Sequence, residues 1–211
     1  SEVLWSTREN RNWDDFQKRL QIQFQRYDAW KANYSRAYFD LKATILPNDN
    51  AGGLLWKLET KQSAADIKYI THYAGRPYEL KFVEGTSYTG PLEVNATKLL
   101  AAISMANGKA VSNPVHQTFL FNKATGKKIT LATSPSPSYP GDGAFTLVNG
   151  AQNEKGRARN NEFIGFNGTD CEALIDLGKP ESISSVVLHT FRQEGAWIWQ
   201  PLTVEVLASD D

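Results

Sequence analysis

The sequence predicts a mainly β protein with an N-terminal helix, followed by two consecutive β-sandwiches. Three observations predict this. Aromatic and aliphatic residues recur every three or four positions between Trp13 and Trp30, the period of an amphipathic helix. From Leu54 onward, short apolar runs are separated by turn residues, as in β-sandwiches. Alternation is clearest at Cys171, Ala173, Ile175 and Leu177, which predicts a strand with one face fully buried.

The helix is expected from Trp13 to about Ala32. Asn12 is a plausible N-cap with Asp15 three residues further on, and Asn33 is a plausible left-handed stop. One face carries an aromatic-rich stripe, Trp13, Phe16, Leu20, Phe24, Tyr27 and Trp30. The opposite face carries Lys18, Arg19, Gln21, Gln25 and Lys31, which suits water. Such a stripe needs a partner larger than a loop, either a missing domain or, in a homodimer, a second copy.

Residues 34–49 are expected to form a connector, and residues 50–122 a small sandwich of immunoglobulin-like proportions. The expected strands cover residues 54–59, 66–73, 92–94, 98–105 and 117–121. Asn107-Gly108 is typical of a tight hairpin between residues 98–105 and 109–111.

Residues 126–211 are expected to form a second sandwich. Its expected strands cover residues 129–132, 171–177, 183–191 and 202–208, and residues 144–148 are apolar. Two long polar loops interrupt it, a proline-rich one at 134–143 and another at 149–161. Loops beside a rigid sandwich commonly carry binding residues.

Composition excludes several classes of function. Lysine plus arginine equals aspartate plus glutamate, at 23 each, so the chain has no net charge for attracting nucleic acid or an anionic membrane. No apolar run is long enough to span a membrane, and no signal-peptide pattern is present. Cys171 is the only cysteine, which excludes an intrachain disulfide and predicts a buried packing role. Both ends of the chain look cut, so we expect an excised fragment.

Several motifs resemble one family in order along the whole chain. Leu4-Trp5-Ser6, Asn12-Trp13-Asp14-Asp15-Phe16 and Asn33-Tyr34 resemble the end of the catalytic barrel of β-N-acetylhexosaminidases of glycoside hydrolase family twenty. Asp66-Ile-Lys-Tyr, Tyr88-Thr-Gly-Pro-Leu and Lys98-Leu-Leu-Ala-Ala resemble the fibronectin type III-like domain that follows it. Gly143-Ala-Phe-Thr-Leu-Val-Asn-Gly, Phe163-Ile-Gly-Phe, Glu172-Ala-Leu-Ile-Asp-Leu-Gly and Trp197-Ile198 resemble a discoidin, or coagulation factor type C, domain, a galactose-binding-like sandwich. Thr71-His72-Tyr73 stands where the family usually has an Asp-Gly turn.

The resemblance implies a domain order. Residues 1–46 would be the terminal helix of a missing (β/α)8 catalytic barrel, which is then a partner. Residues 50–122 would be the fibronectin type III-like sandwich, and residues 126–211 a partial discoidin-like sandwich. It also implies a periplasmic or extracellular location in a bacterium.

The family removes terminal β-linked N-acetylhexosamines with an adjacent Asp-Glu pair, the substrate's acetamido group being the nucleophile. This chain has no Asp-Glu dipeptide and no His-x-Gly-Gly pattern, so no catalytic residue is carried over. Trp5 matches a position that we interpret as structural. His72, His116 and His189 lack metal-ligand spacing. Discoidin-like domains often bind calcium, and Asn149, Asp170 and Glu172 offer oxygen ligands, although no spacing singles them out.

The discoidin-like part is a candidate for glycan binding. The resemblance implies ligands that contain N-acetylhexosamine or galactose. Candidate residues combine aromatic faces with planar polar groups: Tyr139, Asp142, Arg157, Arg159, Arg192, Trp197 and Trp199. The alternatives are a stand-alone carbohydrate-binding module and a purely structural packing or oligomerisation domain. A groove with exposed Trp197 or Trp199 would favour binding, whereas burial of both would favour a structural role.

Overall fold

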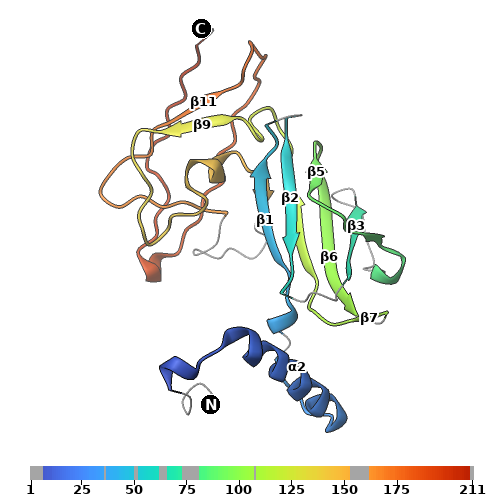
Figure 1. The fold of residues 1–211 in the computed structure, drawn as a ribbon. Coiled ribbons are helices and arrows are strands. Elements are labelled where there is room, and N and C mark those ends of the chain that lie inside the picture. The colour runs from blue at the N-terminus through green and yellow to red at the C-terminus, as the bar shows by residue number, and fades with distance from the viewer. Residues whose placement is uncertain are drawn as a thin grey trace. The chain divides into compact units, whose positions relative to one another are not determined.

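The structure is a computed structural model that describes residues 7–35, 37–49, 52–61, 66–72, 81–106, 108–152 and 162–209, without the side chains at 13, 14, 17 and 39. The chain divides into two compact units, Ser1–Tyr38 and Phe39–Asp211. The described part of the chain contains three antiparallel sheets and one N-terminal α-helix, which confirms the mainly β fold with an N-terminal helix (Figure 1). None of the described helices is long and apolar enough to cross a membrane.

The first unit contains the 3-10 helix η1 (Arg8–Asn10) and the helix α2 (Trp13–Ala29). The N-cap is confirmed, because the backbone N–H of Asp15 donates to Asn12 Oδ1 at 3.1 Å. The end of the helix differs from the expectation. It lies at Ala29, and Lys31, with φ of 54°, takes the left-handed conformation expected for Asn33.

The aromatic stripe is covered in part by the residues that follow the helix. Phe24 is only 8% exposed, and the Tyr34 ring stacks on it with ring centroids 5.1 Å apart. The ring of Tyr38, in the middle of the second 3-10 helix η2 (Ala37–Phe39), has its centroid 5.8 Å from that of Phe24. Tyr34 Oη donates to Asp28 Oδ1 at 2.9 Å, which holds the returning chain in place. Trp30, at the end of the stripe, stays 67% exposed.

Two sheets face each other in the second unit. The first has the order β1-β2-β5 and contains β1 (Lys42–Pro47), β2 (Leu54–Glu59) and β5 (Leu92–Val94). The second has the order β10-β8-β6-β3-β4, with β7 also paired to β6. Its strands are β3 (Asp66–His72), β4 (Thr86–Ser87), β6 (Lys98–Ala106), β7 (Lys109–Ala110), β8 (Val115–Phe119) and β10 (Ala151–Gln152).

The core lies between these sheets, as in a β-sandwich. Leu54, Trp56 and Leu58 of β2 are buried and alternate with more exposed residues, so one face of this strand points inward. They pack with Val94 of β5 and with residues of the second sheet, Ile67, Leu100, Ala102 and Phe119. The side chain of Trp56, 1% exposed, is among the largest that are fully buried.

Strand β6 is buried on both faces. Its other face carries Leu99, Ala101, Ile103 and Met105, which pack with Phe82 of the 3-10 helix η3 (Phe82–Glu84). A strand covered on both sides needs a continuous apolar run, and the sequence Leu-Leu-Ala-Ala-Ile-Ser-Met provides one.

Most strands expected between residues 54 and 121 are confirmed within one or two residues. The hairpin is confirmed by the pairing of Ala106 with Lys109, although Asn107 and Tyr73 lie outside the described residues. The connector expected over residues 34–49 is wrong in part, because β1 pairs along its whole length with β2. β10 pairs with β8 across the expected boundary at residues 122–126. The three-domain division itself stays a prediction.

The chain beyond Gly126 differs most from the expectation. β9 (Lys128–Leu131) and β11 (Ala173–Asp176) form a two-stranded sheet, and the apolar stretch at 144–148 is mainly the 3-10 helix η4 (Gly143–Leu147). All residues of β11 are exposed and so is Cys171, so the expected buried face and buried cysteine are wrong. Residues 183–191 and 202–208 are not strands either, and Figure 1 shows them as an orange to red trace without arrows. A strand needs a partner for its backbone groups, and neither segment has a ladder to join among the described residues.

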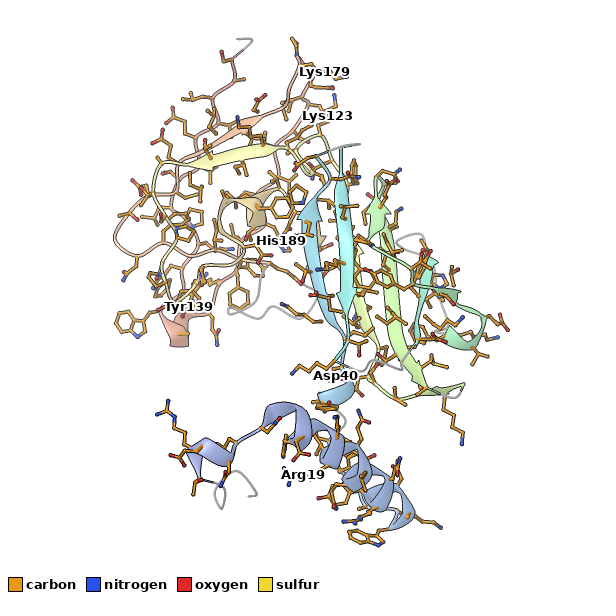
Figure 2. All side chains as sticks on the ribbon, in the orientation of Figure 1. Arg19, Asp40, Lys123, Tyr139, Lys179 and His189 are labelled. Atoms are coloured by element: carbon orange, nitrogen blue, oxygen red, sulfur yellow. The ribbon has the colours of Figure 1, made fainter. Side chains whose placement is uncertain are left out.

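Two lysines of the loop between β8 and β9, Lys123 and Lys127, attach it to the segment after β11, and Lys179 of that segment shares the carboxylate of Glu181. Lys123 Nζ lies 2.9 Å from Glu181, and Lys179 Nζ lies 3.3 Å from the same carboxylate. Figure 2 shows Lys123 and Lys179 near each other. Lys127 Nζ donates to the carbonyl oxygen of Leu177 at 2.9 Å. These contacts fix where the chain leaves β11, which is the segment that leads to the candidate site.

Candidate functional site

Three of the sequence-predicted site residues come together in one short hairpin, residues 192–200, which we call the tryptophan hairpin. Gln193 and Ile198 exchange both backbone hydrogen bonds, N–H to O distances being 3.0 and 3.1 Å. The 3-10 helix η5 (Glu194–Ala196) fills the turn between them. The hairpin therefore positions Arg192, Trp197 and Trp199 from a locally closed backbone.

The two tryptophans of the hairpin are displayed to solvent. Trp197 is 86% exposed and Trp199 is 59% exposed, so neither is the buried plug expected for a structural role. The groove expected beside them stays a prediction. Trp197 also has φ of 59°, a left-handed conformation that costs a bulky L-residue about 1–2 kcal/mol. Backbone strain of this kind concentrates at functional positions. Neither tryptophan is buried in the core. Trp197 displays most of its indole to solvent, and Trp199 displays the part of its ring that Arg192 does not approach.

A charged pair of the hairpin lies beside one of the indoles, that of Trp199. The guanidinium Cζ of Arg192 lies 5.8 Å from the ring centroid of Trp199, within cation–π range. Arg192 Nη2 also forms an ion pair with Glu194 Oε1. Glu194 was not among the predicted residues, although its position two residues after an arginine was the signal that could have found it.

Gln200 is a second polar residue that the sequence reasoning missed. Its Nε2 donates to Thr190 Oγ1 at 2.7 Å, which joins the end of the hairpin to the residue before Phe191. The hydrogen bond orients an uncharged carboxamide and a hydroxyl on the same segment as the indoles. No local sequence signal distinguished this glutamine from other polar loop residues.

The proline-rich loop holds Tyr139 by contacts of its own. Gly165 N–H donates to the Tyr139 carbonyl oxygen at 3.0 Å, and Ser136 N–H donates to the Gly165 carbonyl oxygen at 2.7 Å. A Cβ added at Gly165 would lie 2.9 Å from Tyr139 Cβ, so the glycine is needed for this close approach. Tyr139 therefore has a packing role in addition to its predicted binding role.

The other predicted binding residues lie apart or are not described. Asp142 precedes η4, and its backbone N–H donates to Thr146 Oγ1 at 2.8 Å. Neighbouring atoms desolvate its carboxyl group and raise its pKa, although the residue as a whole is exposed. Arg157 and Arg159 lie outside the described residues. The structure thus groups Arg192, Trp197 and Trp199, and it leaves the four others as separate predictions.

The side chains considered as calcium ligands, Asn149, Asp170 and Glu172, are not grouped into a metal site among the described residues. Asn149 is 2% exposed, and its Oδ1 accepts the Ala151 N–H at 2.9 Å. Asp170 and Glu172 are exposed. Among the described residues, no group of three histidine, cysteine, aspartate or glutamate side chains is placed to hold a metal ion.

The histidine and the thiol nearest the hairpin in sequence have structural surroundings. His189 meets the Phe163 ring edge-on, with centroids 5.7 Å apart. Desolvation raises the pKa of the Cys171 thiol, although the residue as a whole is exposed, and a raised pKa lowers the thiolate fraction at neutral pH. Neither group has the surroundings of a catalytic nucleophile.

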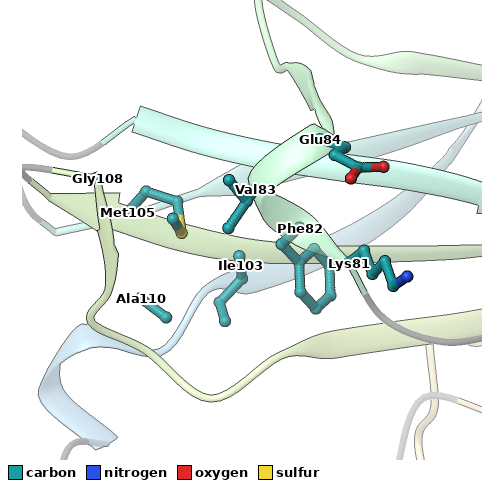
Figure 3. Close-up of a pocket in the computed structure, with 8 residues that line it drawn as sticks. All are labelled: Lys81, Phe82, Val83, Glu84, Ile103, Met105, Gly108 and Ala110. Atoms are coloured by element: carbon teal, nitrogen blue, oxygen red, sulfur yellow. The ribbon is translucent and has the colours of Figure 1, made fainter.

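A separate apolar cavity of about 410 Å³ lies on the outer face of β6. Figure 3 shows Val83, Ile103 and Met105 among the side chains around it, and charge comes from Lys81 and Glu84 at the η3 side. None of the candidate binding residues lines this cavity. It is a gap beside the second apolar cluster, and its lining has no guanidinium, carboxamide or indole group.

No protein-family model matches this chain, and a search of curated proteins finds no match either. Any functional conclusion therefore depends on the motifs and on the geometry of the hairpin.

Proposed function

We propose that this chain is the C-terminal accessory region of a bacterial, periplasmic or extracellular β-N-acetylhexosaminidase, and that it binds glycans through the tryptophan hairpin. The observation that carries the proposal is the exposure of Trp197 and Trp199 in one hairpin, with Arg192 beside the Trp199 ring. The order of the hexosaminidase-like motifs along the chain supports the identity of the parent enzyme.

The chemistry of the hairpin suits a sugar. The face of an indole is electron-rich, so it attracts the C–H groups on the apolar face of a pyranose ring. Guanidinium, carboxylate and carboxamide groups are planar and present paired donors or acceptors to neighbouring hydroxyl groups. Arg192, Glu194 and Gln200 supply one group of each kind within the same hairpin as the two indoles.

The proposed role is non-catalytic. The family's chemistry needs an adjacent aspartate and glutamate, and the sequence contains no Asp-Glu dipeptide. The chain should therefore release no chromophore from a chromogenic N-acetylglucosaminide, and turnover by the purified chain would contradict this part of the proposal.

A second candidate function is structural packing or oligomerisation. It is favoured by the exposed apolar residues between 183 and 207, of which Leu202 is 102% exposed and Val187 is 88% exposed. Exposed apolar surface of this extent usually marks a contact with another protein surface. In that case the sandwich would serve to hold the parent enzyme's domains or subunits together.

Calorimetric titration separates the two roles. The chain is titrated with N-acetylglucosamine oligomers and with a galactose-terminated glycan, each with and without calcium. We expect saturable binding that Trp197→Ala and Trp199→Ala abolish, whereas Trp30→Ala, which removes an exposed tryptophan of the first unit, serves as the matched control and leaves it intact. Absence of heat up to millimolar sugar would leave the structural role.

A further inference from the structure

We propose that the tryptophan hairpin selects uncharged glycans over acidic ones, an inference that rests on its proposed role in glycan binding. The observation is the ion pair of Arg192 with Glu194 directly beside the Trp199 ring. Arginine is the side chain that most readily binds a carboxylate or sulfate, because its guanidinium offers paired donors. In this hairpin a carboxylate of the same chain already pairs with one of those donors, Nη2, and partly neutralises the guanidinium.

The position of the Arg192 guanidinium limits how the carboxylate of an acidic sugar can approach it. One side of it faces the Trp199 ring at 5.8 Å, and Nη2 is directed to Glu194 Oε1. An acidic sugar stacked on the indole would bring its carboxylate next to Glu194, so it would either displace that carboxylate or lie beside it. Like charges a few ångströms apart near a protein surface weaken binding by roughly tenfold or more.

Because the Arg192–Glu194 ion pair is exposed, we expect it to affect the selectivity between charged and uncharged glycans more than the affinity for either. The side chains of Arg192 and Glu194 are 55% and 56% exposed, and exposed ion pairs contribute little to stability. The charges of Arg192 and Glu194 cancel, so the pair presents donors and acceptors without net charge. The carboxamide of Gln200 and the hydroxyl of Thr190 add neutral polar groups. Hydroxyl and acetamido groups of an uncharged hexose or N-acetylhexosamine match this set.

The test compares a galactose-terminated oligosaccharide with the same oligosaccharide capped with sialic acid, which adds one residue and one negative charge. A third glycan, whose sialic acid carboxylate is converted to an uncharged amide, controls for the added residue. All three are titrated into the wild-type chain and into Glu194→Gln, which keeps the shape of the side chain and removes its charge. Glu205→Gln removes an exposed carboxylate outside the hairpin and is the matched control. Circular dichroism verifies that each variant keeps the wild-type fold.

We expect the wild-type chain to prefer the two uncharged glycans to the sialylated one by at least about tenfold. Glu194→Gln should move this ratio of affinities toward the acidic glycan by a similar factor, and added salt should diminish that gain. Glu205→Gln should leave the ratio unchanged.

Equal or tighter binding of the sialylated glycan by the wild-type chain would overturn the inference, as would an unchanged ratio in Glu194→Gln. If none of the glycans binds, the proposed glycan-binding function itself is wrong. The failure of selectivity and the failure of function therefore give different results.

Discussion

Ser104 places a hydroxyl group inside the sandwich core, where none of the described residues forms a hydrogen bond with it. A buried polar atom without a partner costs about 1–3 kcal/mol, so Ser104→Ala should raise the free energy of unfolding by about 1 kcal/mol. Ser112→Ala is the control, because Ser112 Oγ accepts the Ser104 N–H at 3.0 Å and donates to the Asn113 carbonyl oxygen. That variant should lose about 1 kcal/mol in urea unfolding. Equal destabilisation by both variants would contradict this interpretation.

Burial raises the pKa of Glu162 to about 7, well above the ordinary value of 4.5. Between these pH values the folded chain keeps a proton that the unfolded chain has lost. The contribution of Glu162 to stability therefore falls as the pH rises through this window, and the penalty persists above it. Glu162→Gln should be less sensitive to pH than the wild type when urea midpoints are compared at pH 5 and pH 8. Glu172→Gln, at an exposed position, should keep the wild-type dependence, and the same dependence in all three chains would refute the assignment.

At the scale of elements, the N-terminus of α2 depends on one side chain. Asn12 Oδ1 accepts the Asp15 N–H, so Asn12→Ala should destabilise the helix by about 1 kcal/mol, whereas Asn12→Asp should retain the cap. Circular dichroism at 222 nm during thermal unfolding measures this. Equal loss of helix signal in both variants would mean that the side-chain acceptor is not what starts the helix.

Local patterns predicted the elements that depend on local interactions. The start of α2 follows from Asn12 and the three-to-four spacing, and β2 and β5 have the predicted bounds because their apolar residues alternate between turns. β1 was missed because its six residues become a strand only through pairing with β2, a non-local contact. Residues 183–191 have strand-like composition, but β propensity depends on a neighbouring strand, and none of the described residues provides one.

The candidate site was predictable only where its residues are close in sequence. Arg192, Trp197 and Trp199 lie within eight positions, so a hairpin is enough to bring them together. The contact of Tyr139 with Gly165 and the burial of Glu162 arise from the fold of the long loops, which no periodicity encodes. The exposure of both tryptophans is likewise a property of the folded chain.

At the scale of the whole molecule, the apolar residues between 183 and 207 should make the chain self-associate. Sedimentation equilibrium should give a weight-average mass that rises with concentration above the monomer value of 23.6 kDa. Replacing Val187 and Leu202, 88% and 102% exposed, by lysine should restore the monomer. Thr203→Lys is the control, since it adds charge at an exposed position without removing apolar surface. A monomer at every concentration would contradict this prediction.

A homodimer that forms through the helix stripe is a separate prediction. Trp30 keeps part of that stripe exposed, whereas Phe24 is covered by Tyr34 and Tyr38. Trp30→Lys should reduce self-association only if the helix contributes to the contact, and the same sedimentation experiment distinguishes the two surfaces.

The central claim, that the tryptophan hairpin binds glycans, is tested most directly by nuclear magnetic resonance of the indole N–H groups during titration with N-acetylglucosamine oligomers. The six tryptophans give separate probes, and Trp56, 1% exposed in the core, is an internal control. The account predicts saturable shifts of the Trp197 and Trp199 signals while the Trp56 signal stays in place. Unmoved Trp197 and Trp199 signals at millimolar sugar, in this titration and in one with a galactose-terminated glycan, would contradict it.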